Sequence, residues 1–200
     1  MKHCKLLLMA VGAAVLLGGL TSAASARTLS YSSQSWWHIW REVRFSGLFG
    51  TTSCQLTLEG SMHERTIPKV RGWLVGFGTR ARLGSCASGT ATILSETLPW
   101  HEEYAGFRGT LPNVIAIIAN FINVSGRVRE TGGITCLFRS TATEPVVVTR
   151  NVSSGTITSA EIGGSVRTGA ECFGAAGTFT SDRGTAAVAG TSTRITINLI

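Results

Sequence analysis

The feature that most constrains the fold is a series of short runs rich in Thr, Val, Ile and Phe, which begins after Ser30 and continues to the end of the chain. Gly and Ser separate these runs. Residues of this kind favour strands, and regular spacing by turn-forming residues is typical of sandwiches and barrels. We therefore expect a mainly β protein, and we predict a single antiparallel β-sandwich of roughly eight to ten strands.

Individual runs show the two-residue period of a half-buried strand. In the segment 54–58, Cys and Leu alternate with polar residues, so the apolar side chains should share one buried face. The segment 70–83 predicts a long strand in which glycines mark a bulge or a bend. The segments 122–130 and 134–140 flank a Thr-Gly-Gly sequence and predict a hairpin.

The segment 112–121 departs from this pattern. Its Val, Ile and Phe side chains fall on one side of a helical wheel, and strand parity separates them poorly. Pro112 suits the first turn of a helix, where its missing N–H costs nothing. We predict one short α-helix at 112–121 that covers one end of the β core.

The N-terminal residues have the layout of a secretion signal. Lys2 and Lys5 precede an apolar stretch at 6–20, and Ala24-Ser25-Ala26 places small residues at a signal peptidase site. The apolar stretch is shorter than the roughly 20 residues that span a bilayer, and no later segment reaches that length. We predict a cleaved signal peptide at 1–26 and no transmembrane span after cleavage.

The rest of the chain, 27–200, contains no internal repeat, no low-complexity linker and no shift in composition. A single domain is the simplest organisation for this length. We expect one secreted β domain, preceded by a loose N-terminal tail at 30–35. The location predicted from the signal is secreted or extracellular, or else periplasmic or within the cell envelope.

Four cysteines remain after signal removal, and an even number in an exported protein predicts two disulfides. Three connectivities are possible, and pairing in chain order is favoured because it closes two loops of moderate length. No two of these cysteines are close in sequence, which disfavours a metal or redox site. The favoured pairs are Cys54 with Cys86 and Cys136 with Cys172.

The chain carries a net charge of +7, from 18 basic and 11 acidic residues. Nucleic-acid binding requires basic residues gathered on one face, whereas here they are scattered. Arg80 with Arg82, and Arg127 with Arg129, have the spacing that puts two side chains on one side of a strand. We expect solvated strand faces and no nucleic-acid partner. The alternative, an anionic-surface patch, requires these four arginines to converge.

Catalytic signatures are weak, and we expect neither an enzyme nor a bound metal or cofactor. The Gly-x-Ser-x-Gly turn is absent and Asp182 is the only aspartate, so a serine triad is poorly supported. The densest polar group is His101-Glu102-Glu103-Tyr104. Successive residues of a strand point to opposite faces, so we favour exposed polar residues over a functional cluster.

Three tryptophans, Trp36, Trp37 and Trp40, lie within five residues of one another beside His38. Large aromatic side chains are more often buried than exposed, which favours packing in the core. The alternative is a ligand surface on which the indoles contact sugars or a lipid interface.

The layout of the chain resembles that of the bacterial secreted proteins known as protein activators of alkane oxidation, and of uncharacterised actinobacterial exported proteins. The shared features are the signal peptide, a β segment between Cys54 and Cys86, Leu98-Pro99-Trp100, the later cysteines Cys136 and Cys172, and a final apolar strand ending at Ile200. The resemblance implies a non-enzymatic β protein associated with hydrophobic surfaces or biofilm matrix. It supplies no catalytic residues.

These observations predict a secreted, non-catalytic bacterial β protein of the cell envelope or extracellular matrix, with a structural or surface-interaction role. Its expected partner is a hydrophobic surface, a glycan or an envelope component. The alternative is a carbohydrate-binding or hydrolytic module. In that case the indoles at 36–40 form a platform, and His101 with Glu103 is the reactive pair of the polar cluster at 101–104.

Overall fold

The computed structural model describes residues 28–47, 50–129, 133–168, 177–181 and 183–200. Within these ranges the chain forms fifteen strands and one turn of 3-10 helix, so the prediction of a mainly β protein is confirmed. The elements are β1 (Thr28–Tyr31), β2 (Ser35–Gly47), β3 (Gly50–Met62), β4 (Thr66–Pro68), β5 (Trp73–Cys86), β6 (Thr90–Ile93), η2 (Ser95–Thr97), β7 (Trp100–Thr110), β8 (Asn113–Ile122), β9 (Ser125–Arg129), β10 (Thr135–Arg139), β11 (Val146–Asn151), β12 (Thr156–Thr168), β13 (Gly177–Ser181), β14 (Gly184–Val188) and β15 (Ile197–Leu199).

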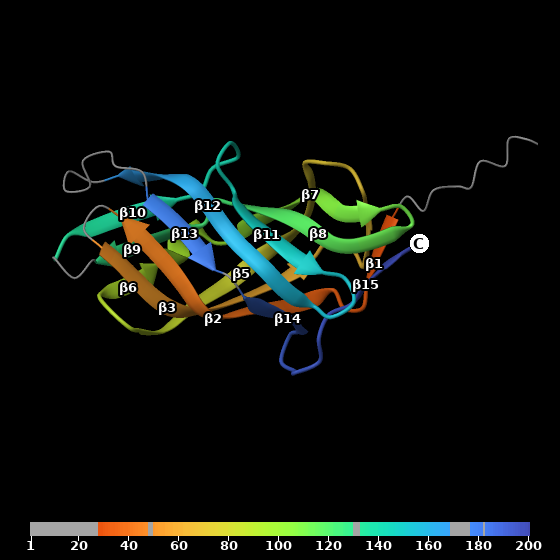
Figure 1. Ribbon diagram of the computed structural model, residues 1–200, viewed down its shortest axis with the longest axis horizontal. Helices are drawn as coiled ribbons and strands as arrows, with labels where there is room; N and C mark the ends of the chain where they lie inside the picture. The colour runs from red at the N-terminus through yellow and green to blue at the C-terminus, as the bar shows by residue number, and fades with distance from the viewer. Residues whose placement is uncertain (1–27, 48–49, 130–132, 169–176, 182) are drawn as a thin grey trace, which may run out of the picture.

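Eight of the strands close into an antiparallel barrel (Figure 1). Their order around the wall is β11, β8, β7, β5, β3, β2, β13 and β12, and β12 pairs with β11 to complete the circle. The short strand β14 continues the wall beside β13, because it also pairs with β2 on one side and β12 on the other. The predicted single sandwich is therefore wrong.

Long, bent strands explain the closure. β2, β3 and β12 have 13 residues each and β5 has 14, which is longer than a usual sandwich strand. The register shifts within the β2–β3, β3–β5 and β7–β8 pairs, and such bulges bend a strand and increase its twist. A twisted sheet of eight strands can then curl until its first and last strands meet.

A three-stranded sheet, in the order β15, β1, β4, lies at one end of the molecule, and β6, β9 and β10 lie at the other (Figure 1). The first sheet pairs Leu29 with Leu199, so it joins the start and the end of the described chain. Leu29 and Tyr31 are buried. The predicted loose tail at 30–35 is therefore wrong at its start, since residues 30 and 31 belong to β1.

The predicted helix at 112–121 is wrong, because residues 113–122 form strand β8. β8 is one of the strands of the barrel wall, and it pairs with β7 on one side and β11 on the other. Its Val and Ile residues favour strands when neighbouring strands satisfy their backbone groups. Ile117 and Phe121 are buried, while Ile118 on the opposite face is half-buried. Apolar side chains on both faces produced the helical pattern in the sequence.

The predicted hairpin around residue 132 is confirmed at the level of its strands. β9 and β10 are antiparallel, and Thr135 pairs with Arg129. β10 also pairs with β12, which attaches this smaller sheet to the barrel.

One disulfide, Cys54–Cys86, is present in the described part of the chain, where the sequence predicted two. It joins a directly opposed pair of residues on β3 and β5. Cys136 is buried in the core, and its predicted partner Cys172 lies outside the described residues, as does the predicted signal peptide at 1–26.

Across the described ranges, no helical segment has the length and hydrophobicity that a membrane span requires.

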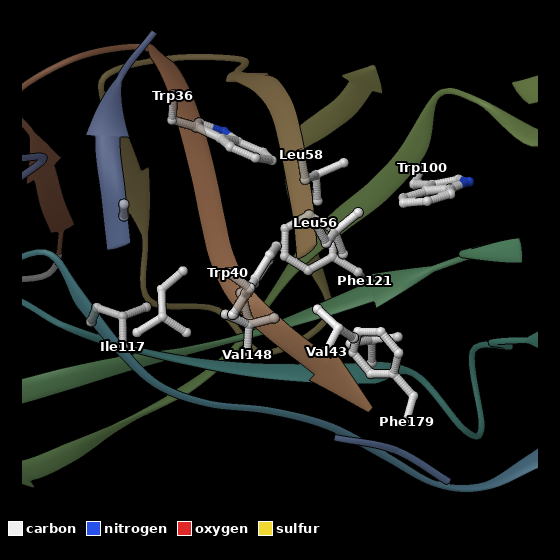
Figure 2. Packing of buried hydrophobic residues seen from close by; sticks show 14 of the residues in the cluster. Trp36, Trp40, Val43, Leu56, Leu58, Trp100, Ile117, Phe121, Val148 and Phe179 are labelled. Carbon is white, nitrogen blue, oxygen red and sulfur yellow. The ribbon is translucent and has the colours of Figure 1, made fainter. Parts of the chain in front are cut away.

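Glycines make room for the indoles inside the barrel. Trp36 lies opposite Gly60 on β3, and Trp40 lies opposite Gly184 on β14. Figure 2 shows Trp36 and Trp40 directed from β2 into the same interior as Phe121. A Cβ atom on Gly60 would lie 2.3 Å from Cζ2 of Trp36, so only glycine fits beneath that ring.

We expect Gly60→Ala to destabilise the protein by about 3 kcal/mol, because the new methyl group overpacks the core. The added Cβ would also lie 2.3 Å from the backbone oxygen of Phe77, which cannot move aside as a flexible side chain can. Urea denaturation followed by circular dichroism measures the effect. Gly84→Ala is the matched control, since its Cβ would meet the side chain of Gln55 at 3.1 Å. Equal stability of the two variants would contradict this packing.

Candidate functional site

Three ionisable side chains meet inside the barrel. His38 comes from β2, Glu102 from β7 and Arg150 from β11, and none of these strands is adjacent to another of the three. Each side chain falls on the buried parity of its strand, and their exposed fractions are 0%, 0% and 2%. The cluster therefore forms only when the barrel closes.

Arg150 connects the other two residues. Its Nη2 donates a hydrogen bond to Oε1 of Glu102 at 3.2 Å and a short hydrogen bond to Nε2 of His38. Arginine has only donors, so Nε2 of His38 must accept. The proton of the neutral imidazole is then on Nδ1. One guanidinium group thus links three parts of the barrel wall.

Burial controls the charge states of this cluster. It lowers the pKa of His38 well below the ordinary value, and the positive charge of Arg150 lowers it further. Burial raises the pKa of Glu102, while the charge and hydrogen bond of Arg150 oppose this increase. His38 is therefore neutral at neutral pH, whereas Arg150 keeps its charge.

Aromatic rings surround the three polar groups. Trp36 stacks on the ring of His38 at a centroid distance of 4.2 Å, and Trp40 meets His38 edge-on at 5.4 Å. Phe121 packs edge-on against His38 at 5.8 Å. The ring of Tyr31 lies 5.8 Å from the guanidinium carbon of Arg150, so β1 covers the cluster from the end sheet. Burial raises the pKa of Tyr31 also, which keeps its hydroxyl protonated.

Six polar atoms around this cluster are buried and make no hydrogen bond with any part of the chain that the structure describes. Five of them are donors in the charge states described above, and one is an acceptor. An unpaired buried polar group costs about 1–3 kcal/mol, so the cluster lowers the stability of the barrel unless other packing offsets this cost. The six atoms are Nε1 of Trp36, Nδ1 of His38, Nε1 of Trp40, Oε2 of Glu102, and Nε and Nη1 of Arg150.

The three tryptophans do not form an exposed platform. Trp36 and Trp40 are buried in the barrel, which confirms that they pack in the core. Trp37 is half-buried and lies on the opposite face of β2, where it pairs with Glu59 and Ala187. The three indoles therefore do not share one ligand surface, because side chains alternate between the two faces of β2.

His101 and Glu103 lie together on the outer face of β7 and are both half-buried. The ring of His101 contacts the ring of Phe77 edge-on, at a centroid distance of 5.2 Å. Their strand parity directs both side chains away from the buried cluster. The role of His101 and Glu103 as a reactive pair remains a prediction.

Arg150 was not predicted as a site residue, and the prediction that Glu102 is exposed is wrong, because Glu102 is 0% exposed. The alternation of apolar residues in both strands could have indicated that these two charged side chains are buried. Glu102 alternates with Trp100 and Tyr104 on the buried face of β7, and Arg150 follows Val148 on the buried face of β11. A charged residue on an apolar strand face requires a partner, because burying an unpaired charge is costly. The identity of that partner is not visible in a single strand.

Comparisons with protein-family models, curated proteins and solved structures find no match for this chain. The site must therefore be interpreted from its own geometry. Among the described residues, no group of three or more His, Cys, Asp and Glu side chains is arranged to hold a metal ion. The arrangement is an ion pair extended by one neutral histidine inside an aromatic enclosure.

The depressed pKa of His38 predicts a pH-dependent contribution to stability. A lowered folded-state pKa means that protonation favours the unfolded chain, so this contribution is present above pH 6.5 and is lost as the pH falls toward the folded-state value. The contribution of Glu102 depends on pH in the opposite direction, because folding raises the pKa of Glu102. This contribution to stability is present below pH 4.5 and is lost as the pH rises through the pKa of Glu102 in the folded protein.

We therefore expect the stability difference between the unmodified protein and His38→Gln to shrink below pH 6.5, by up to about 1.4 kcal/mol per pH unit. Gln offers an oxygen acceptor to Arg150 but does not titrate, and Glu102 is common to both proteins. Urea denaturation across this pH range measures the difference. His63→Gln is the control at an exposed histidine. A pH-independent difference for His38→Gln would show that His38 is not buried in its neutral form.

Proposed function

We propose that this chain is an exported, non-catalytic β protein of the bacterial cell envelope or extracellular matrix, and that it acts through its outer surface. The enclosure of Arg150, Glu102 and His38 is the observation that carries the proposal. Glu102 and His38 are of the residue types used in acid–base chemistry, but both are 0% exposed, so a substrate in solvent does not reach them through the closed wall.

The buried cluster supports a structural role. The hydrogen bonds of Arg150 cross the interior from β11 to β7 and to β2, so they couple strands that are not neighbours in the wall. A register slip of one residue in any of these strands would turn its polar side chain out of the barrel. The cluster therefore favours one register over its alternatives, as buried polar groups do in some other proteins.

Two observations support export. The Cys54–Cys86 disulfide suits an oxidising compartment, because such bonds persist mainly in secreted and periplasmic proteins. The N-terminal residues have the layout of a cleaved signal peptide. The expected partners remain a hydrophobic surface, a glycan or another envelope component.

Intact-mass analysis of the full chain expressed in a bacterial host tests this proposal. The protein is alkylated without reductant before the measurement. We expect exported protein that begins at Arg27 and carries no alkylated cysteine. Protein retained in the cytoplasm with residues 1–26 attached and four alkylated thiols in the rest of the chain would overturn the proposal. Polysaccharide hydrolysis that is lost in Glu103→Gln would support the hydrolytic alternative instead.

A further inference from the structure

A basic groove lies on the outer wall of the barrel, on the side opposite to the buried face of β2. It runs over β2 and β14, which lie side by side in Figure 1, and reaches the start of β12. The segment 191–194 forms its other side. The groove has a volume of about 900 Å³ and is open to solvent.

Four arginines line this groove: Arg41, Arg44, Arg183 and Arg194. Glu42 is the only acidic residue among the described lining residues, so these residues carry an excess of three positive charges. Guanidinium groups keep their charge at any physiological pH. The charge is therefore concentrated here, although the sequence distributes the four residues over 154 positions.

The carboxylate of Glu42 does not neutralise the groove. Oε1 of Glu42 accepts a hydrogen bond from Nε of Arg44 at 2.8 Å, and this contact lowers the pKa of Glu42. Arg194 donates to the backbone oxygen of Ser154 at 3.3 Å, which positions its guanidinium group without removing its charge. Arg41 and Arg183 are exposed and make no ion pair among the described residues.

The other lining residues narrow the class of ligand. Thr156, Thr185, Thr191 and Ser192 also line the groove and give it a polar surface that suits a sugar. The hydroxyls of Thr156 and Thr191 are already hydrogen-bonded to Ser154 and to the backbone oxygen of Val188. The described lining has no aromatic side chain, which disfavours a single-stranded nucleic acid, because its bases bind by stacking. A concave groove also fits a chain better than it fits a flat lipid surface. Arginine forms paired hydrogen bonds with carboxylates.

We infer that this groove binds a carboxylated polysaccharide, with Arg41 and Arg183 pairing with carboxylates of the polysaccharide. The inference rests on the proposed surface-interaction role and names its partner as an acidic glycan. Ion pairing at an exposed site weakens with salt, so the binding decreases as ionic strength rises.

Calorimetric titration of the exported protein with oligogalacturonate tests the inference, and neutral dextran is the ligand control. We expect Arg41→Gln/Arg183→Gln to weaken binding about tenfold or more, which corresponds to about 1.4 kcal/mol, because the variant removes two charged hydrogen-bond donors from the groove. The variant should also show a weaker dependence on salt. Arg127→Gln/Arg129→Gln is the matched control, because it removes two exposed arginines from β9.

Three results would overturn the inference: no binding of oligogalacturonate, equal losses in the two double variants, or tighter binding of single-stranded DNA or of anionic vesicles than of the oligosaccharide. Circular dichroism of both variants confirms that each is folded before the titrations are compared. A protein that is exported and processed but binds no oligogalacturonate refutes this inference alone. A protein that stays in the cytoplasm with its leader refutes the proposed function.

Discussion

Replacement of Arg150 by methionine is expected to destabilise the protein by about 3–5 kcal/mol, the usual cost of removing one partner from a buried ion pair. The loss leaves the Glu102 carboxylate inside the barrel without a cation, and it leaves Nε2 of His38 without its donor. The side chains of Arg150 and Glu102 are 3% and 1% exposed, so solvent does not compensate for the missing charge. Urea denaturation near neutral pH measures the change in the free energy of unfolding.

The double variant Arg150→Met/Glu102→Leu gives the sharper test. Replacing both partners of a buried ion pair by apolar residues of similar size is often neutral or stabilising. We therefore expect the double variant to be more stable than Arg150→Met. Arg80→Met, which breaks the exposed pair with Glu59, should cost at most about 1 kcal/mol. A double variant less stable than Arg150→Met would contradict the structural role assigned to the ion pair.

Loss of the Cys54–Cys86 disulfide is expected to lower the free energy of unfolding by about 3–4 kcal/mol. The two cysteines are separated by 32 positions, and a loop of this length gives that value in the chain-entropy model. The bond also fixes β3 against β5 at a directly opposed pair of residues. The variant for this measurement is Cys54→Ala/Cys86→Ala, compared with the unmodified protein under oxidising conditions.

The single variants Cys54→Ala and Cys86→Ala make the measurement specific to the covalent bond. Either substitution breaks the disulfide, so each single variant should lose most of what the double variant loses. Effects of the singles that add up to the double would mean that packing, and not the bond, accounts for the loss. Cys54 is 2% exposed and Cys86 is half-buried, so the cavity left by Cys54→Ala is expected to destabilise the protein more than the cavity left by Cys86→Ala.

Strand-level features were predictable because they depend on residues close in sequence. The alternation in 54–58 matches the observed burial, with Cys54, Leu56 and Leu58 inside the barrel. The hairpin of β9 and β10 was predicted from its turn residues. The Cys54–Cys86 pairing in chain order is also confirmed.

The segment 112–121 was predicted as a helix because only the residues of the segment itself were considered. An amphipathic helix and a strand with apolar residues on both faces have similar patterns over ten residues. β8 is a strand because β7 and β11 satisfy its backbone groups on both sides, and neither partner can be inferred from the segment itself.

The sequence by itself determined a mainly β protein with period-two strands, and it favoured a hairpin near residue 132 and a Cys54–Cys86 disulfide. Only the tertiary structure decided between a sandwich and a barrel, because inward and outward residues alternate in the same way in both. Closure depends on the pairing of β11 with β12 and on the register of every strand between them. That closure brings His38, Glu102 and Arg150 together across up to 112 positions of the chain, and it places the four groove arginines on one outer face.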